Sequence, residues 1–365
     1  MIRRHAILFA GLVMTALAGI LHYAVSDTAG TIAASAPLLL VAPLVAQGTD
    51  ALRGRLSTSV VGIVQSAFGN AAEFAITVLA LRANLPEVVK IAIVGSLLGN
   101  AVLLGGIAGL LPLVRGGWSA TLTFERRLFS GIATLSVIAF VPIAILSVPS
   151  GLLQAGDRRG VTLAAGIALT VVGVVFILTE LRAPAPPHAV EAREAPEPAE
   201  AAKAAEPALP FRLGLAYLGV GGAMAAITAE WFVAGFQPAT KTIGIPTAFA
   251  ALVIIPLLGN VAENYVAMRY AWDGDGDGAM SVIMHSVVQI ALLMTGILVI
   301  ASQFIGRSAL SLQLDPVLTV SLGLALVVLW MILYDGEMQP VEAIGLIAVY
   351  VILGATVWAE GSLGT

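Results

Sequence analysis

Cysteine is absent from the chain, charged residues make up only 11% of it, and aromatic residues 6%. Without cysteine, disulfide bonds and thiolate metal sites are excluded. Soluble domains carry about 25% charged residues, so a soluble chain of this composition would expose a large apolar surface to water. The 18 lysines and arginines are outnumbered by 22 aspartates and glutamates, so no basic surface for nucleic acid is expected.

Catalytic motifs are missing as well. The sequence contains no HExxH motif, no glycine-rich phosphate loop and no credible serine, histidine and aspartate set. We therefore expect no enzyme activity and no resident cofactor.

Long apolar runs dominate the 365 residues, of which 59% are hydrophobic, and the mean hydropathy is +0.97. A helix that spans a bilayer needs about 20 mostly apolar residues, and the chain lacks the alternating pattern of a membrane barrel. We predict an all-α polytopic membrane protein. Its eleven predicted spans are 6–26, 32–49, 57–81, 87–113, 124–149, 160–181, 211–235, 245–270, 279–304, 315–334 and 340–359.

The first span follows Arg3, Arg4 and His5, an arrangement also typical of a signal peptide. Its apolar run is long for a signal, so we favour a retained helix; cleavage is the alternative and would leave ten spans. An N-terminus in the cytoplasm would put twelve of the 18 lysines and arginines on the cytoplasmic side. This positive-inside bias predicts that orientation, in the plasma (inner) membrane.

An internal repeat divides the chain. Residues 69–74 read GNAAEF and residues 259–264 read GNVAEN, while 95–100 read GSLLGN and 285–290 read HSVVQI. Both pairs are offset by 190 positions, and such a fixed offset indicates two related halves.

The halves predict the domain organisation. An additional transmembrane helix occupies 1–30, the first five-helix repeat 31–182 and the second 211–365. Between them, residues 183–210 form an acidic linker rich in proline and alanine, which has little to bury and is expected to lie in the cytoplasm. Because each repeat has five spans and one linker joins them, the two would enter the membrane from opposite sides. These are inverted repeats, the plan of many secondary transporters.

Two glutamates, Glu73 and Glu263, lie well inside apolar spans, at equivalent positions of the repeats. A charge at the centre of a bilayer costs roughly 2.5 to 3.5 kcal/mol on insertion scales. The alternative to a functional site is a glutamate neutralised by an internal lysine or arginine, but no basic residue lies deep in any span. We therefore predict that both glutamates bind the transported ion and also take up the protons that are coupled to transport.

Other polar residues share helix faces with the glutamates. Residues three or four positions apart lie on one side of a helix, which groups Ser66, Asn70, Glu73 and Thr77, and likewise Asn260 with Glu263. The predicted supporting ligands, from four spans, are Asn70, Asn260, Ser96, Ser286 and Gln289, with Asn100 on the face of Ser96. Hydrogen bonding between helices is the alternative role for these amides and hydroxyls. An all-oxygen site with two carboxylates suits a hard divalent cation, above all calcium.

These motifs carry a family resemblance over roughly residues 32–360. GNAAEFAITVLALRA with KIAIVGSLLGNAVLLGGIAGLL resembles the first repeat of the cation/proton exchanger (CAX) family of the calcium/cation antiporter superfamily. PTAFAALVIIPLLGNVAEN with SVIMHSVVQIAL resembles the second. The resemblance implies eleven helices and the expulsion of cytoplasmic calcium in exchange for protons, with Glu73 and Glu263 as the central carboxylates. A sodium- or potassium-coupled exchanger, and a cation channel or sensor, stay open as alternatives.

Three positions depart from the family pattern: Asn264 stands where histidine is usual, His285 where glycine is usual, and Gly99 where serine is common. His285 precedes Ser286 and titrates near neutral pH in its ordinary form. It is a candidate for proton coupling; a neutral histidine hydrogen-bonded between helices is the alternative. Partners are expected to be calcium, protons and lipid, with a homo-oligomer as a further possibility.

Two acidic features remain. Residues 273–278 read DGDGDG, like the start of an EF-hand loop, but the loop's twelfth position is Met284 instead of glutamate. We expect a solvated acidic turn, with a weak calcium-attracting site as the alternative. Glu230 lies inside the seventh span and is a candidate to line the cytoplasmic cavity or to assist proton entry.

Overall fold

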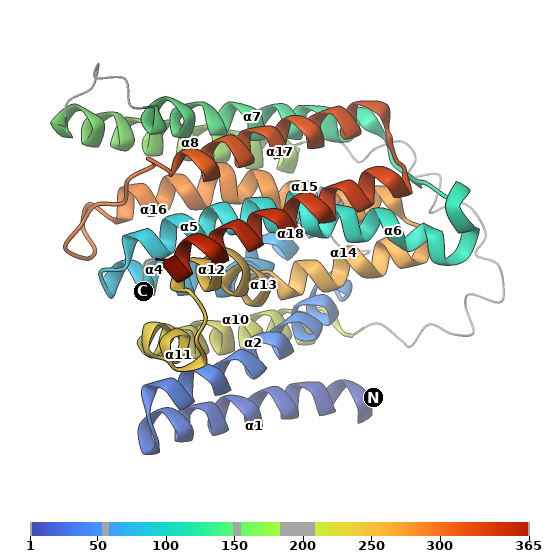
Figure 1. The fold of residues 1–365 in the computed structure, drawn as a ribbon. Helices are drawn as coiled ribbons and strands as arrows, with labels where there is room; N and C mark the ends of the chain where they lie inside the picture. The colour runs from blue at the N-terminus through green and yellow to red at the C-terminus, as the bar shows by residue number, and fades with distance from the viewer. Residues whose placement is uncertain (1, 53–57, 149–154, 183–208, 364–365) are drawn as a thin grey trace.

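The computed structural model describes residues 2–52, 58–148, 155–182 and 209–363. Most of the predicted linker lies outside the described residues. Figure 1 shows a bundle of helices with the N-terminus at one end and the C-terminus at the other, as an odd number of membrane crossings requires.

The additional N-terminal helix packs against one helix of each repeat. Helix α1 (Ile2–Ala24) leads through a tight turn into α2 (Asp27–Asp50). Ser26 caps α2, because its hydroxyl accepts a hydrogen bond from the N–H of Ala29 (3.1 Å). Helix α10 (Phe211–Ala234) lies beside both.

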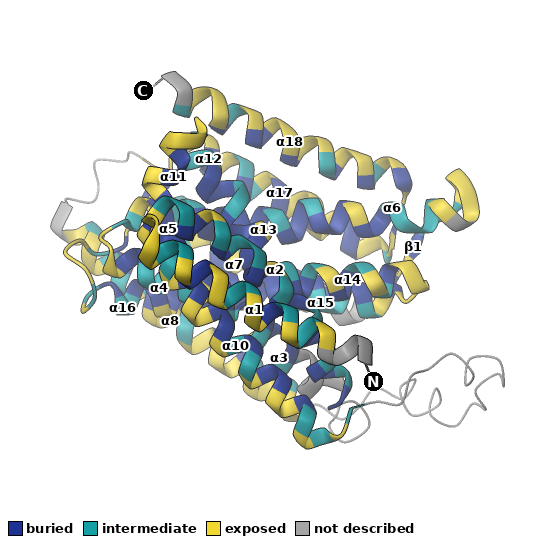
Figure 2. Ribbon diagram, turned by 90° about the horizontal axis from the view of Figure 1, so that it is seen from below, coloured by how far each residue is buried: buried dark blue, intermediate teal, exposed yellow. Residues whose placement is uncertain are grey.

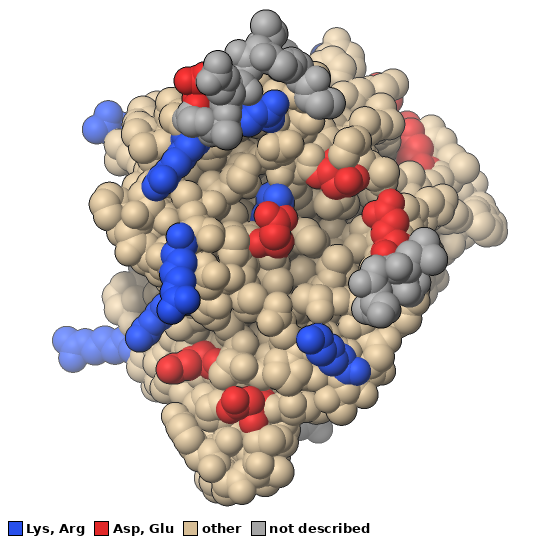
Figure 3. Space-filling view, turned by 60° about the vertical axis from the view of Figure 1, so that its left-hand side comes forward, with Lys and Arg blue, Asp and Glu red and all other residues tan. Residues whose placement is uncertain are grey.

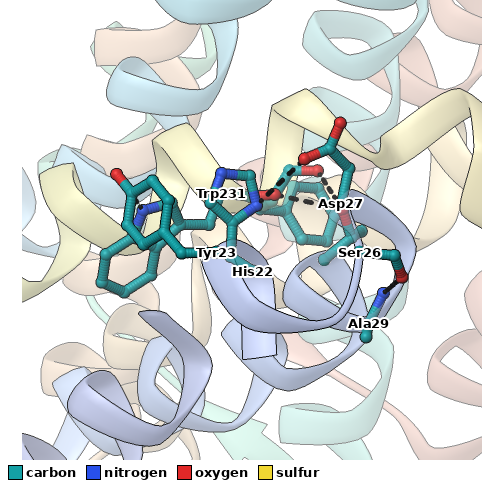
Figure 4. A network of polar contacts seen from close by, with 8 residues as sticks. His22, Tyr23, Ser26, Asp27, Ala29 and Trp231 are labelled. Atoms are coloured by element: carbon teal, nitrogen blue, oxygen red, sulfur yellow. Dashed lines mark hydrogen bonds and ion pairs between the residues drawn. The ribbon is translucent and has the colours of Figure 1, made fainter. Parts of the chain in front are cut away.

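Small residues and an aromatic cluster hold α1 in place. A Cβ on Gly19 would lie 2.8 Å from the Trp231 ring of α10, so glycine permits this close approach. Figure 4 shows His22, Tyr23 and Trp231 grouped at the C-terminal end of α1. The indole N–H of Trp231 donates to the Tyr23 hydroxyl (3.5 Å), and Nδ1 of His22 lies 3.4 Å from Asp27 Oδ1. Aromatic residues with polar tips are typical of the membrane interface.

The rest of the first repeat consists mainly of interrupted helices. Its elements are α3 (Thr58–Gly69), α4 (Ala71–Arg82), α5 (Pro86–Leu98), the π-helix η1 (Gly99–Leu104), α6 (Gly105–Gly116), the 3₁₀ turn η2 (Gly117–Ser119), β1 (Leu122–Thr123), α7 (Arg126–Ser147) and α8 (Ala155–Arg182).

The second repeat follows the same plan after α10. Its elements are α11 (Phe236–Ile243), α12 (Thr247–Phe249), the π-helix η4 (Ala250–Ile254), α13 (Ile255–Gly259), α14 (Val261–Asp273), α15 (Gly276–Val288), the π-helix η5 (Gln289–Met294), α16 (Thr295–Ala301), α17 (Pro316–Asp335), β2 (Glu337–Met338) and α18 (Pro340–Leu363).

The offset of 190 residues extends to the backbone. Helices α5 and α15 both have 13 residues, and each continues into a six-residue π-helix that starts 190 positions apart, at Gly99 and Gln289. The interruption at Asn70 has its equivalent at Asn260. The repeat is therefore structural, as the motifs predict.

The expected eleven crossings correspond to three kinds of helix. In the described part of the chain, eight helices are long and apolar enough to span a membrane, and the number rises to ten if each of two bent pairs is one span. Helix α7 contains a further apolar stretch, Gly131–Ser147, and is the eleventh candidate.

Two predicted spans were wrong in shape, because they are not continuous helices. Span 57–81 is bent by 44° between Gly69 and Ala71. Span 245–270 is divided at Asn260, and its first part joins α11, a short helix that we did not predict, at an angle of 119°. That turn follows from Gly244, which ends α11 with φ 76°, and from Pro246, which precedes α12.

The interrupted helices form the core of the bundle. In their most apolar windows, 83% of residues are buried along Pro86–Val114 and 78% along Gly276–Ala301, against 28% for α8 and 17% for α1. Figure 2 shows the buried residues concentrated on central helices and the exposed ones along outer helices such as α18. The outer helices present apolar surface where lipid would contact the protein.

Charged residues gather at the helix ends. Figure 3 shows the face at the end opposite the N-terminus, where both signs are scattered over a largely uncharged surface. At the other end, β1 pairs with β2 and the DGDGDG turn packs beside β1. There Asp275 caps α15 by accepting from Gly278 N–H (2.8 Å), and Asp277 accepts from Glu125 N–H (2.6 Å). These carboxylates serve the local backbone, and the turn does not form an EF-hand loop.

Candidate ion site at the crossing of the two repeats

The two repeats meet where each interrupted helix bends. A Cβ on Gly69 would lie 2.5 Å from Cγ of Glu263, and one on Gly259 would lie 2.7 Å from Cβ of Glu73. Each glycine therefore packs on the glutamate of the opposite repeat. The structure thus gives a reason for these glycines, because the two repeats of the chain cross closely here.

Asparagine occupies both bends. Asn70 has φ −85° and ψ 0°, and Asn260 has φ −105° and ψ 14°. This bridge region is sparsely populated and is common in functional sites. Helices α4 and α14 start after these residues, so each glutamate lies in the first turn of a helix, three positions after the bend. The positive end of the helix dipole favours a carboxylate there.

Glu263 is held from the first repeat. Its side chain is fully buried, and Oε1 accepts hydrogen bonds from Ser66 Oγ (2.8 Å) and Asn70 Nδ2 (3.0 Å). Asn70 also accepts from Ser286 Oγ (3.4 Å), and Ser286 in turn accepts from Asn100 Nδ2 (2.8 Å). Two residues thus bond the carboxylate directly, and Ser286 and Asn100 extend the network through Asn70.

Glu73 is held differently. Its side chain is also fully buried, and Oε1 accepts a short hydrogen bond from the hydroxyl of Ser96. Asn260 of the second repeat donates through Nδ2 to the same hydroxyl (3.2 Å). The Ser96–Asn260 pair therefore positions Glu73, much as Ser66 and Asn70 position Glu263.

Three buried oxygens in this cluster have no hydrogen-bond partner within the described residues: Oε2 of Glu73, Oε2 of Glu263 and Oδ1 of Asn260. Neither carboxylate forms an ion pair with lysine or arginine in the described part of the chain. Burying an ionised carboxylate without a counter-charge is costly. A divalent cation would neutralise both carboxylates and take the three oxygens as ligands, and hard cations such as calcium use this type of ligand.

The structure brings most of the predicted site residues together and leaves others aside. The predicted residues form two hydrogen-bonded networks, one around Glu263 with Asn70 and Ser286, together with Ser66 and Asn100, and one around Glu73 with Ser96 and Asn260. The two networks meet at the crossing of the repeats, where Gly69 packs on Glu263 and Gly259 on Glu73, and together they form the candidate cluster. Gln289 is buried at the start of η5, and its amide nitrogen has no partner among the described residues. Thr77 bonds to carbonyl groups of its own helix instead (2.9 Å and 3.0 Å).

His285 faces away from the cluster. Its Nδ1 lies 2.8 Å from the carbonyl oxygen of Ser281, and its Nε2 lies 3.9 Å from Glu180 Oε2 on α8. The ring also packs against Phe176. Helix rotation therefore directs His285 toward α8, although its neighbour Ser286 belongs to the cluster.

Glu230 is exposed, four residues before the end of α10. It lies at the end of that helix opposite to the end that follows the linker, so it does not line a cavity on the linker side. We did not predict Tyr350 from the sequence. Its side chain is 6% exposed, and its hydroxyl has no hydrogen-bond partner within the described residues. A tyrosine in the middle of an apolar span was the available signal, because a buried phenol needs a partner.

Comparison with known proteins adds relatives over most of the chain. Residues 213–359 match the family described as sodium/calcium exchanger protein. The Ca(2+)/H(+) antiporter of Aphanothece halophytica is 26% identical, and the match covers 88% of this chain and 87% of that protein. The Ca(2+)/H(+) antiporter ChaA of Bacillus subtilis is 25% identical, with 87% and 88% covered. The vacuolar calcium ion transporter of Schizosaccharomyces pombe is 24% identical, with 87% and 76% covered.

Solved structures share the fold. Native YfkE matches with a TM-score of 0.77 at 19% identity, covering 98% of this chain and 99% of the other. The H+/Ca2+ exchanger CAX matches with a TM-score of 0.70 at 14% identity, covering 98% and 93%. The sodium–calcium exchanger NCX_Mj matches less closely, with a TM-score of 0.60 at 15% identity and coverage of 88% and 95%. The fold of this chain is thus shared with these three structures.

Proposed function

We propose that the chain belongs to the cation/proton exchanger family, with which it shares relatives over most of its length, and that it is a secondary transporter that exchanges cytoplasmic calcium for protons. One observation carries the proposal. Glu73 and Glu263 are fully buried at the crossing of the two repeats, each packed against the glycine that precedes the bend of the other repeat, and each keeps one carboxylate oxygen without a partner in the described structure. A pair of carboxylates can hold either one divalent cation or protons.

Exchange follows from this competition. Calcium binds when both carboxylates are ionised, and the two negative charges balance its charge. Protons neutralise the same oxygens and displace the ion. An empty, doubly charged site would be costly to carry through an apolar barrier. Only the calcium-loaded and the protonated protein would then change conformation readily, which couples the two fluxes.

Alternating access is the movement that we propose. Inverted repeats are related by a pseudo-twofold axis in the membrane plane, so exchanging the conformations of the two halves would open the site first to one side and then to the other. We propose an N-terminus in the cytoplasm of a cell whose plasma (inner) membrane holds the protein, following the distribution of lysine and arginine. Calcium would then move outward as protons enter.

The decisive experiment uses purified protein in sealed liposomes. A proton gradient drives calcium uptake, measured with an internal calcium dye, and calcium drives proton flux, measured with a pH dye. Glu73→Gln and Glu263→Gln keep the shape of the side chain but remove its charge and its titrating proton, so each should abolish both fluxes. Glu360→Gln is the matched control, since this exposed glutamate near the end of α18 lies outside the cluster. If either site variant exchanges calcium for protons near the wild-type rate, the shared site is wrong.

Sodium-coupled exchange is the second candidate, since the matched family is described as sodium/calcium exchanger protein. Replacing the proton gradient by a sodium or potassium gradient in the same liposomes separates the two. Proton coupling predicts calcium flux with the proton gradient alone. A channel would instead pass calcium without any opposing flux of protons or sodium.

A further inference from the structure

The two halves of the ion site differ in their polar side chains. By the offset of 190 residues, Ser66 corresponds to Pro256 and Gln289 corresponds to Gly99. Ser66 donates to Glu263 (2.8 Å), but Pro256 has no donor to offer Glu73. Gly99 has no side chain at all. The Glu73 half therefore lacks two polar groups that its counterpart has.

Tyr350 comes from a different helix and reaches this depleted half. A Cβ on Gly99 would lie 3.9 Å from the Tyr350 hydroxyl oxygen and 3.9 Å from Cβ of Pro256. The phenol thus ends beside Gly99, one of the two positions without a polar side chain, and Gly99 itself borders the other, Pro256. It is the buried hydroxyl, without a partner in the described structure, that was noted above.

Helix α18 holds Tyr350 firmly in that place. On one side of Tyr350 along α18, the carbonyl oxygen of Ala343 and Cγ1 of Ile347 would lie 2.7 Å and 2.8 Å from a Cβ on Gly106 of α6. On the other side, Gly354 packs against Phe249 of α12, whose ring lies 3.6 Å from the position of a Cβ there. The helix is therefore fixed to both repeats, on either side of the phenol.

The position of the hydroxyl relates it to the Ser96–Asn260 pair. Gly99 lies three residues after Ser96, and Pro256 lies four residues before Asn260, so each is on the same helix face as its partner, one turn away. Ser96 and Asn260 are joined by a hydrogen bond (3.2 Å), and Ser96 donates to Glu73. The phenol thus borders Gly99, which lies one helical turn from Ser96, the residue that donates to Glu73.

We propose that Tyr350 is a positioning residue of the calcium site, whose hydroxyl holds a water molecule between itself and the Ser96–Asn260 pair on the Glu73 side. A phenol both donates and accepts, and a buried water needs two to four polar partners. Hard cations readily keep water among their ligands. This inference rests on the proposed function, because the water serves the ion bound by Glu73.

Removal of the hydroxyl tests the proposal. Tyr350→Phe keeps the ring and its packing, so the protein should fold normally. The KM for calcium in proton-driven uptake should rise about two- to tenfold, the effect of one neutral hydrogen bond, and calcium binding to the purified protein at fixed pH should weaken by the same factor. An unchanged KM and an unchanged binding affinity would overturn the proposal.

Rescue at Gly99 separates chemistry from packing. A Cβ at Gly99 meets only ordinary contacts at 3.9 Å, so both serine and alanine fit there. In the Tyr350→Phe background, Gly99→Ser supplies a new hydroxyl beside the lost one and should restore calcium affinity, whereas Gly99→Ala should not. Restoration by both variants would mean that volume at Gly99, and not a hydroxyl, corrects the defect. Restoration by neither would mean that the Tyr350 hydroxyl does not act through the space beside Gly99. Both results overturn the proposal.

Two checks complete the design. If Tyr350→Phe alone does not give folded protein, Gly99→Ser with Tyr350 retained tests the same point, because a second hydroxyl should leave KM unchanged or lower it, and a several-fold rise would overturn the proposal. Failure of the proposed function is recognised separately. Exchange activity in the Glu73→Gln variant would refute the shared site. If Glu73→Gln is inactive but the separate Tyr350→Phe variant has the wild-type calcium KM and affinity, this inference alone is refuted.

Discussion

Adding one methyl group at Gly69 probes the crossing of the two repeats. The new carbon would lie 2.5 Å from Cγ of Glu263 and 3.1 Å from Oε1, whereas carbon atoms pack at about 3.5–4.0 Å. The glutamate side chain is flexible, so it should turn aside and stretch its hydrogen bonds from Ser66 and Asn70. Overpacking of this kind costs about 1–3 kcal/mol, which corresponds to a loss of calcium affinity of about 5- to 150-fold.

The reciprocal change, Gly259→Ala, should be more damaging. Its methyl carbon would meet Cβ of Glu73 at 2.7 Å and Cα at 3.0 Å. These atoms belong to the helix backbone or are attached directly to it, and they move only if α4 and α13 separate. We expect a lower yield of folded protein for Gly259→Ala and folded, weakly binding protein for Gly69→Ala.

The measurements are calcium KM in proton-driven uptake and the elution profile and melting temperature of purified protein. Gly345→Ala is the matched control, since this glycine of α18 is exposed and a Cβ there would meet nothing within 4 Å. Wild-type KM and stability for Gly69→Ala would refute the close crossing of Gly69 and Glu263. Equal behaviour of the two alanine variants would refute the distinction between side-chain and backbone contact.

Three further predictions follow from the same contacts. Ser66→Ala removes a hydrogen bond to Glu263 and should raise the calcium KM about tenfold or more, as expected for a bond to a charged group; a change below twofold would contradict this. His285→Gly should leave the calcium KM at high pH within about twofold of wild type, because the ring contacts Ser281 and Glu180 instead of the carboxylates. Loss of a hydrogen bond to the site would change KM by more than about twofold. If His285 takes part in proton coupling, the same variant should shift the pH dependence of exchange. An unchanged pH profile would rule out that role. Deleting residues 188–206, which are rich in proline, alanine and glutamate, should leave transport intact, and loss of transport at normal expression would assign the linker a structural or regulatory role.

The sequence alone determined the class of the protein, its repeats and its central carboxylates. Lengths of apolar sequence fix the number of crossings, because the thickness of the bilayer sets the length of a span. The motifs offset by 190 residues located the two halves, and the high cost of a charge in lipid drew attention to Glu73 and Glu263. Each of these conclusions depends on a physical constraint that acts along the chain.

Only the tertiary structure decided which atoms meet. Several features depend on how helices from different repeats pack. They are the bends at Asn70 and Asn260, the contact of each glycine with the opposite glutamate, and the different hydrogen-bond donors to Glu73 and to Glu263. Side-chain direction is equally a property of packing. His285 and Ser286 are neighbours in sequence, yet a helix turns by about 100° per residue, so one faces α8 and the other faces the ion site. Tyr350 comes from the last helix and lies beside Gly99, at a sequence distance that no local pattern records, because the folding of the second repeat brings α18 against η1.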